Sequence, residues 1–269
     1  MIPVFHPHFD VWLILGTVGL AYWYVNERIR PHWQPLVPPP TIRQWTWFYL
    51  GLGLIWLFTD WPVHDLAEQS LYSVHMAEHM VITLIGPPLM LMGLSRPLAD
   101  RLFGHRLVLP WLSQLARPVV AFTIYNIGMI ATHWPEVVAL SVTNELAHFG
   151  FHLFLFVSGV LLWIPVLSAS SVLARLRPPT RLLYLFFNSI LPTVPASFLT
   201  FSQVPLYPIY GEAAQAFGVS PVDDQTIAGL VMKLGGTLLL WVVMAVTWFR
   251  WAAEEERWDQ IEKDLRTRV

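Results

Sequence analysis

Residues 72–94 read YSVHMAEHMVITLIGPPLMLMGL, and this apolar stretch decides the fold class. It is long enough to cross a bilayer as a helix, because about 20 apolar residues span the hydrocarbon core. His75 and His79 lie within it, and a spacing of four residues places both side chains on one helix face. His148 and His152 repeat this spacing in a second apolar stretch. Because imidazole is costly inside a bilayer, the two pairs predict a polar cavity, a polar partner or a metal ion.

The composition is that of a membrane protein. The chain has 269 residues, of which 55% are hydrophobic and only 13% are charged, whereas soluble domains carry about 25% charged residues. We expect an all-α, polytopic membrane protein built as a bundle of seven transmembrane helices over residues 1–250, followed by a charged cytoplasmic tail over 251–269. No Lys or Arg precedes the first apolar stretch, residues 9–26. It is therefore interpreted as a transmembrane span that is retained, and not as a signal peptide that is cleaved off. The expected spans are 9–26, 44–61, 72–94, 117–134, 144–167, 182–203 and 227–249.

The distribution of basic residues predicts the orientation. Fifteen of the sixteen Lys and Arg residues fall in alternate connections and the tail, and the connections 62–71, 135–143 and 204–226 hold none. Basic loops stay in the cytoplasm, so the N-terminus is expected outside and the C-terminus inside. The sixteenth, Lys233, lies within the last span. Its ammonium group either snorkels to the outer surface or pairs with Glu78, Glu145, Asp223 or Asp224.

This topology places most histidines in the outer half of the membrane. Three different helices bring imidazoles to one layer, as a metal site open to the outside requires. The candidate ligands are His75, His79, His148, His152 and His133. The alternative is a hydrogen-bonded polar network that holds the bundle together. His6 and His8 are interpreted as part of a flexible terminus and His64 as a loop histidine, while Pro192 and Pro195 predict a kink in the sixth span.

Carboxylates and thioethers accompany these histidines. Glu78 and Glu145 each lie three residues from a histidine of one pair, where a carboxylate can orient an imidazole. The other candidate supporting residues are Asp60, at the outer end of the second span, Lys233, and the thioethers of Met76, Met80 and Met232. Cysteine is absent, and a His/Met ligand set suits a copper ion, although ligand type alone leaves zinc and iron open.

Several motifs together resemble one family. His75-Met76-Ala77-Glu78-His79-Met80 and Gly86-Pro87-Pro88-Leu89 resemble the HM-x-x-HM…PPL signature of CtaG-type assembly factors of cytochrome c oxidase. Further elements occur in the same order over residues 45–250: Asn126 with His133-Trp134-Pro135, His148 and His152 with Trp163-Ile164-Pro165, Pro205-Leu206-Tyr207-Pro208, and Asp224-Gln225 with Gly229 to Met232. Lys233 departs from this pattern, in which an aromatic residue is expected.

The resemblance implies a non-enzymatic assembly factor in the cytoplasmic membrane of a bacterium. It implies copper handling on the outer side, with the lipid bilayer, cytochrome c oxidase subunits and other copper chaperones as partners and no role for nucleic acid. Two alternatives stay open from the residues. One is a haem-binding or metal-dependent membrane redox protein, because histidines on the third and fifth spans are able to ligate haem. The other is a metal transporter.

Overall fold

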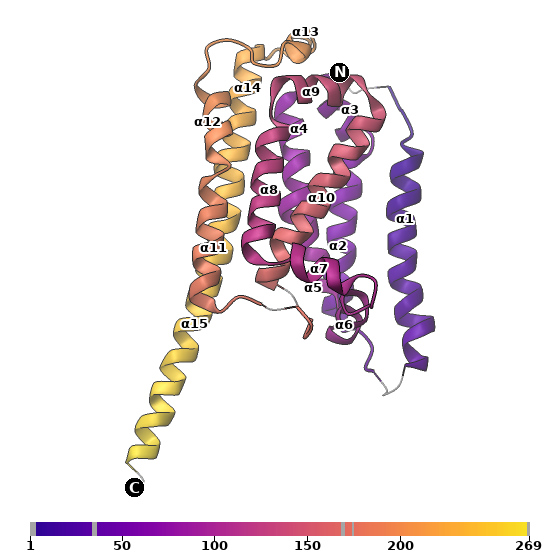
Figure 1. The fold of residues 1–269 in the computed structure, drawn as a ribbon. Coiled ribbons are helices and arrows are strands. Elements are labelled where there is room, and N and C mark those ends of the chain that lie inside the picture. The colour runs from indigo at the N-terminus through magenta and orange to yellow at the C-terminus, as the bar shows by residue number, and fades with distance from the viewer. Residues whose placement is uncertain (1–3, 34–36, 168–169, 174, 268–269) are drawn as a thin grey trace.

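The fold is a helical bundle, known here from a computed structural model that describes residues 4–33, 37–167, 170–173 and 175–267. Within these residues every regular element is a helix, which confirms the all-α prediction. Figure 1 shows the long helices side by side, with α1 at one edge and α11, α12, α14 and α15 at the other. The short helices α3, α9 and α13 gather at the end that carries the N-terminus, and α6 and α7 at the opposite end.

The long helices overlap the stretches predicted from the sequence, whereas the short helices α3, α6, α7, α9 and α13 lie in the connections and were not predicted. Their bounds are α1 Phe9–Tyr24, α2 Ile42–Thr59, α3 Val63–Gln69, α4 Tyr72–Met80, α5 Gly86–Gly93, α6 Arg96–Phe103, α7 Leu109–Leu115, α8 Pro118–Thr132, α9 Pro135–Thr143, α10 Glu145–Leu167, α11 Pro178–Ile190, α12 Thr193–Phe201, α13 Gly211–Gln215, α14 Pro221–Leu230 and α15 Gly236–Arg266. The last helix continues without a break from the expected seventh span through the charged tail.

Four continuous helical segments are long and apolar enough to cross a membrane by length and composition. They are Tyr72–Gly93, Glu145–Leu167, Pro178–Phe201 and Pro221–Arg266. The pair α7 and α8, bent by 72° at the break between them, makes a fifth if it is counted as one span. The length and apolar composition of these helices identify the chain as a membrane protein. The count of seven spans stays a prediction.

Prolines and π-helical turns interrupt these long segments. The π-helical turn η3, Val81–Ile85, joins α4 to α5 directly before Pro87 and Pro88, whose rings cannot continue the regular hydrogen-bond ladder. Such turns widen a helix by one residue and recur at functional sites. The break between α11 and α12 falls at Leu191 and Pro192, which is where the sequence predicts a kink, and the kink itself stays a prediction.

The segment from α4 to α5 forms the centre of the bundle. It packs against α2 on one side, α14 on another, and α10 along η3 and α5. Gly159 of α10 makes the close approach possible, because a Cβ atom there would lie only 2.6 Å from the backbone oxygen of Thr83. Because Gly159 has no side chain, α10 and its histidines can lie close to the segment from α4 to α5.

Asp224 of α14 fixes the start of α4. Its carboxylate accepts hydrogen bonds from the backbone N–H groups of Tyr72, at 2.7 Å, and Ser73, at 3.2 Å, and from the Ser73 hydroxyl. The first N–H groups of a helix have no partner within the helix, and here a buried carboxylate from another helix supplies one. This contact holds the first turn of α4, which leads directly to His75.

Substituting Gly159 tests the close approach of α10 and α4. Gly159→Val is expected to destabilise the protein by about 1–3 kcal/mol, because the added atoms meet backbone that cannot move aside. Gly150→Val on the same helix is the matched control, since nothing lies within 4 Å of a Cβ atom at that position. Thermal unfolding in detergent measures both. Equal melting temperatures for the two variants would contradict this account of the packing.

Substituting Asp224 tests the cap. Asp224→Ala leaves two buried N–H groups of α4 without their acceptor and is expected to cost about 1–3 kcal/mol of stability. Asp223→Ala is the control on the same turn, because the contacts of Asp223 are to Ser220 at the surface. The measurement is thermal unfolding of the two variants beside the wild type. If the melting temperature of Asp224→Ala falls no further than that of Asp223→Ala, the capping role is refuted.

Candidate metal centre

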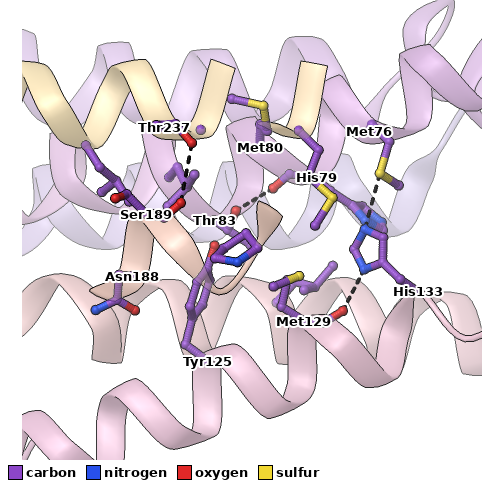
Figure 2. A pocket seen from close by; sticks show the side chains of 16 residues that line it. Met76, His79, Met80, Thr83, Tyr125, Met129, His133, Asn188, Ser189 and Thr237 are labelled. Carbon is purple, nitrogen blue, oxygen red and sulfur yellow. Dashed lines mark hydrogen bonds between the residues drawn. The ribbon is translucent and has the colours of Figure 1, made fainter. Parts of the chain in front are cut away.

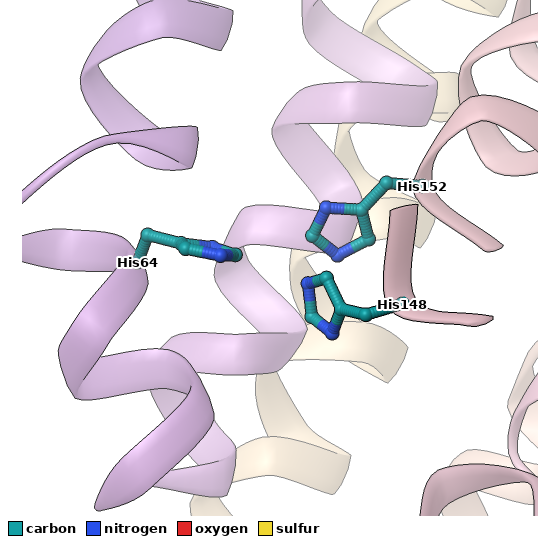
Figure 3. Close-up of side chains that lie close together, drawn as sticks. All are labelled: His64, His148 and His152. Atoms are coloured by element: carbon teal, nitrogen blue, oxygen red, sulfur yellow. The ribbon is translucent and has the colours of Figure 1, made fainter. Parts of the chain in front are cut away.

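Histidines from α3, α4 and α10 converge in the end of the bundle that lies next to the N-terminus. Figure 3 shows His64 of α3 facing His148 and His152 of α10. One nitrogen from each of these three imidazoles lies within 4.8 Å of the other two. His64 and His148 are each only 6% exposed. Three nitrogens at this separation can reach one ion by small side-chain rotations, because metal–imidazole bonds are about 2.0–2.1 Å long.

Local sequence signals place these side chains. Asn144 begins α10, and its side-chain oxygen accepts the Ala147 N–H at 2.9 Å, as an N-cap residue does. His148 and His152 therefore lie on the first two turns of α10. On α3, His64 and Glu68 are four residues apart and share a helix face.

Two carboxylates hold the imidazoles in position. His64 Nδ1 donates to Glu78 Oε1 at 2.8 Å, and His152 Nδ1 lies 3.8 Å from the same oxygen. Glu68 Oε1 lies 2.9 Å from His148 Nδ1, and its other oxygen lies 3.7 Å from His64 Nε2. A carboxylate on one ring nitrogen orients the other nitrogen toward a metal. Both acids thus serve as orienting groups or as direct ligands.

The charge balance at His64 follows from these contacts. Burial lowers the pKa of this imidazole, but the carboxylates of Glu78, Glu68 and Asp65 more than offset that effect and raise the pKa to about 9. The contact with these carboxylates therefore favours the protonated form of the His64 imidazole. Binding of a metal ion at its second nitrogen would release a proton, because a metal ligand must be the neutral imidazole.

His75 and His79 extend the cluster along α4. Their rings lie 4.1 Å apart, and the ring of His79 is 5.3 Å from that of His152. His75 is 2% exposed, and its Nδ1 lies 3.4 Å from the hydroxyl of Tyr210. His79 thus links the histidines of α3 and α10 to the interior of the bundle.

Five of the twelve buried side-chain nitrogens and oxygens that have no hydrogen-bond partner among the described residues belong to this cluster. They are both ring nitrogens of His79, Nε2 of His148, Nε2 of His152 and Oε2 of Glu78. Buried polar groups are nearly always paired, so an unpaired group needs an explanation. Lone pairs on imidazole nitrogens and a carboxylate oxygen are suitable metal ligands. The donor set therefore fits a metal ion.

A cavity lined by thioethers adjoins His79 (Figure 2). It has a volume of about 40 Å³, and its walls include His79, His133, Met76, Met80, Met129 and Met232. His133 Nδ1 lies 2.6 Å from the Met129 carbonyl, which accepts only, so this nitrogen carries the hydrogen. Its other nitrogen lies 3.3 Å from the sulfur of Met76. Ligands of this kind are soft and favour copper(I).

The comparison with family models agrees with the motifs. The model of the cytochrome c oxidase caa3 assembly factor (Caa3_CtaG) matches residues 20–254. The chain belongs to this family. No curated protein and no solved structure matches the chain. The cytochrome c oxidase caa3 assembly factor family thus accounts for nearly all of the bundle, including the helices that carry the histidine cluster.

Within this caa3 assembly factor, most of the predicted site residues lie close together. His75, His79, His148 and His152 share one cluster, and His133 lies next to it, with ring centroids 6.3 Å from those of His79. Glu78 lies among them as predicted, and Met76, Met80 and Met232 line the adjoining cavity. The two histidine pairs therefore belong to one site.

Three predicted supporting residues lie apart from the cluster. Glu145 is exposed at the start of α10, because the first turn of this helix turns it away from His148. Asp60 accepts hydrogen bonds from the indoles of Trp12, at 2.6 Å, and Trp56, at 3.0 Å. Lys233 Nζ lies 3.3 Å from Ser197 Oγ and above the Phe201 ring. No carboxylate among the described residues lies within ion-pairing distance of Lys233, so of the two alternatives for this residue the ion pair does not form.

The interpretation of His64 as a loop histidine is wrong. It lies on helix α3, is buried, and forms the side of the cluster opposite α10. Glu68, which sequence reasoning passed over, takes the place expected for Glu145 beside His148. A signal for both residues was present, since His64 and Glu68 have the i, i+4 spacing of a helical pair in an outer connection. The helix has only seven residues, which is why it reads as a loop.

A double-mutant cycle tests the contact of His64 with Glu78. His64→Ala and Glu78→Ala are each expected to cost about 1–3 kcal/mol, because each leaves a buried partner unpaired. The double variant should cost less than their sum, which indicates direct coupling. The folded pKa of His64 is raised from 6.5 to about 9, so this stabilisation is complete below pH 6.5 and disappears as the pH rises through 9. Thermal unfolding of chelator-treated protein measures the cycle, and additive costs at every pH would contradict it.

Proposed function

We propose that this protein binds a copper ion at its histidine cluster and delivers it to cytochrome c oxidase during assembly of the oxidase. The observation that carries the proposal is the convergence of the His64, His148 and His152 nitrogens within 4.8 Å of one another. His75, His79 and His133 supply further nitrogens, and Glu68 and Glu78 orient the rings. In this role copper is cargo, so the site must release the ion as well as bind it.

The ligand chemistry favours copper over the other metals. The site combines imidazoles, two carboxylates and an adjoining wall of thioethers, and copper lies at the top of the affinity order for such ligands. The chain has no cysteine, so the tetrahedral thiolate sites typical of structural zinc do not arise. The rings of the cluster stand 4.1–6.4 Å apart, and the nitrogens of His64, His148 and His152 lie within 4.8 Å of one another. This close grouping of three imidazoles suits a single bare ion.

The proposed topology has seven spans with the cluster on the extracytoplasmic side of a bacterial cytoplasmic membrane. The helices α1, α2 and α8 supply the three spans beyond the four longest helical segments. The connections at the end with α3, α9 and α13 contain no Lys or Arg, and this composition is typical of the outer side. Residues 1–250 then form the transmembrane domain, and the end of α15 extends into the cytoplasm.

The proposal assigns a carrier role and no catalysed reaction. Ligand exchange, in which one imidazole replaces another on the ion, explains both uptake and release. Oxidase subunits are the recipients, and copper chaperones outside the membrane are the donors. Transport of the ion across the membrane is the second candidate, and uptake of copper into sealed vesicles would favour it over the carrier role.

Metal analysis of purified protein tests copper binding. His148→Ala/His152→Ala is expected to weaken copper binding at the buried cluster by more than about 100-fold, because loss of orienting groups alone costs up to about that much and here two ligands are lost. His32→Ala/His105→Ala is the matched control, since both residues are exposed and lie on connections at the far end of the bundle. Equal copper affinity of the two double variants would refute the site.

Complementation tests the assembly role. In cells that lack the protein, the wild type and the His32→Ala/His105→Ala variant are expected to restore cytochrome c oxidase activity, and His148→Ala/His152→Ala is not. Thermal unfolding and membrane levels must first show that the variants fold. Full oxidase activity with the His148→Ala/His152→Ala variant would mean that assembly depends on the protein as a scaffold, without copper at this site.

A further inference from the structure

A second group of metal-ligating side chains lies at the surface, outside the buried cluster. The segment ahead of α1 carries His6 and His8 next to Asp65 of α3. His8 Nε2 lies 3.3 Å from Asp65 Oδ2, and His6 Nδ1 lies 4.0 Å from Asp65 Oδ1. One ligand atom from each of the three residues lies within 4.8 Å of the other two. Two imidazoles and a carboxylate make a common ligand set for a first-row divalent cation.

The three side chains differ in their access to solvent. The side chain of His6 is 69% exposed, that of His8 is 13% exposed, and that of Asp65 is only 3% exposed. An ion arriving from solution therefore meets His6 first and reaches the Asp65 carboxylate last. This order of exposure suits capture of an ion at a surface better than permanent storage.

The segment is held in place on both sides of the two histidines. Phe5 packs edge-on against the ring of Trp61 at 5.4 Å, and the indole of Trp12 donates to Asp60 at 2.6 Å. Pro7 stands between His6 and His8 and restricts the backbone there. These contacts give the segment defined neighbours, and its flexibility stays a prediction. Preorganised ligands bind an ion at a lower entropic cost.

The surface group is continuous with the buried cluster. The rings of His8 and His64 meet edge-on with centroids 4.8 Å apart, and the ring of His64 is 5.0 Å from that of His148. Asp65 and His64 are neighbours in the chain, so α3 contributes to both groups. An unbroken series of imidazoles thus leads from His6 at the surface to the buried nitrogens of α10.

We propose that His6, His8 and Asp65 form an outer copper site that captures the ion and passes it to the buried cluster. Transfer takes place by ligand exchange at constant oxidation state: His64 binds the ion as His6 leaves it, and His148 and His152 then replace His8 and Asp65. The transfer step rests on the proposed function, because it needs the buried cluster as acceptor. Binding at the outer site does not depend on it.

Counting bound ions tests the outer site with Cu²⁺ alone as the probe. The full-length protein in detergent is expected to bind two Cu²⁺ ions per chain at equilibrium. His6→Ala/His8→Ala should bind one ion, His148→Ala/His152→Ala should also bind one, and the combined variant should bind none. His32→Ala/His105→Ala is the control with the same number of histidines removed, and thermal unfolding verifies that each variant folds.

The outcomes separate the two proposals. If His6→Ala/His8→Ala still binds two ions, or if His148→Ala/His152→Ala binds none, the outer site is refuted. A third outcome is that the wild type binds one ion, and that this ion is lost in His6→Ala/His8→Ala but not in His148→Ala/His152→Ala. This result would refute the buried site and the transfer step and would support the outer site. In that last case His6, His8 and Asp65 act as a separate surface site.

The loading rate tests transfer. After Cu²⁺ is mixed with protein, a membrane-impermeant chelator is added briefly to remove the ions that are not buried. The Cu²⁺ that stays bound to the protein measures the occupancy of the buried site. Removal of the outer ligands in His6→Ala/His8→Ala should slow this loading at least about tenfold, because an ion held next to the cluster has a high effective concentration. The final occupancy of the buried site should not change. An unaltered loading rate would show that His6 and His8 take no part in delivery and act only as partners of Asp65.

Discussion

The structure depends on the need of buried imidazole nitrogens for a partner. A ring nitrogen withdrawn from water loses its hydrogen bonds, and an apolar bundle returns them only through another polar group or a metal ion. Here the bundle brings the histidines of α3, α4 and α10 together, and carboxylates on neighbouring helices partner some of their nitrogens: Glu78 contacts His64, and Glu68 contacts His148. The nitrogens without a hydrogen-bond partner are those of His79, His148 and His152. A metal ion is the partner that would offset the cost of burying them.

The surrounding fold keeps these rings at a fixed separation. Gly159 allows α10 to approach the backbone of the α4 segment, and Asp224 anchors the first turn of α4 from α14. Met76 and Met80 lie on the same helix as His75 and His79, and together with Met129 of α8 and Met232 they continue the wall toward the interior with thioethers. The result is a change from nitrogen and oxygen ligands near the end of the bundle to sulfur ligands deeper inside.

In the proposed carrier role, this change in ligand type would help the protein to hand the ion on. Membership of the caa3 assembly factor family connects the chain to the construction of cytochrome c oxidase. A carrier works when its successive ligand sets differ only modestly in affinity, because a single very tight site would retain the ion. A series of imidazoles with carboxylates on one side and thioethers on the other offers several such sets within a short distance.

The sequence by itself determined the all-helical membrane architecture, the helix interruption at Pro192 and the grouping of the two histidine pairs. These features follow from local properties: apolar length, the proline ring and the helical repeat of 3.6 residues. Only the tertiary structure decided which carboxylates serve the site and that His64 belongs to it. Glu145 has the right spacing from His148 but faces away, while Glu68 and His64 arrive from a seven-residue helix that packs against α4. Spacing fixes neighbours along one helix, whereas partners from another helix depend on how the helices pack.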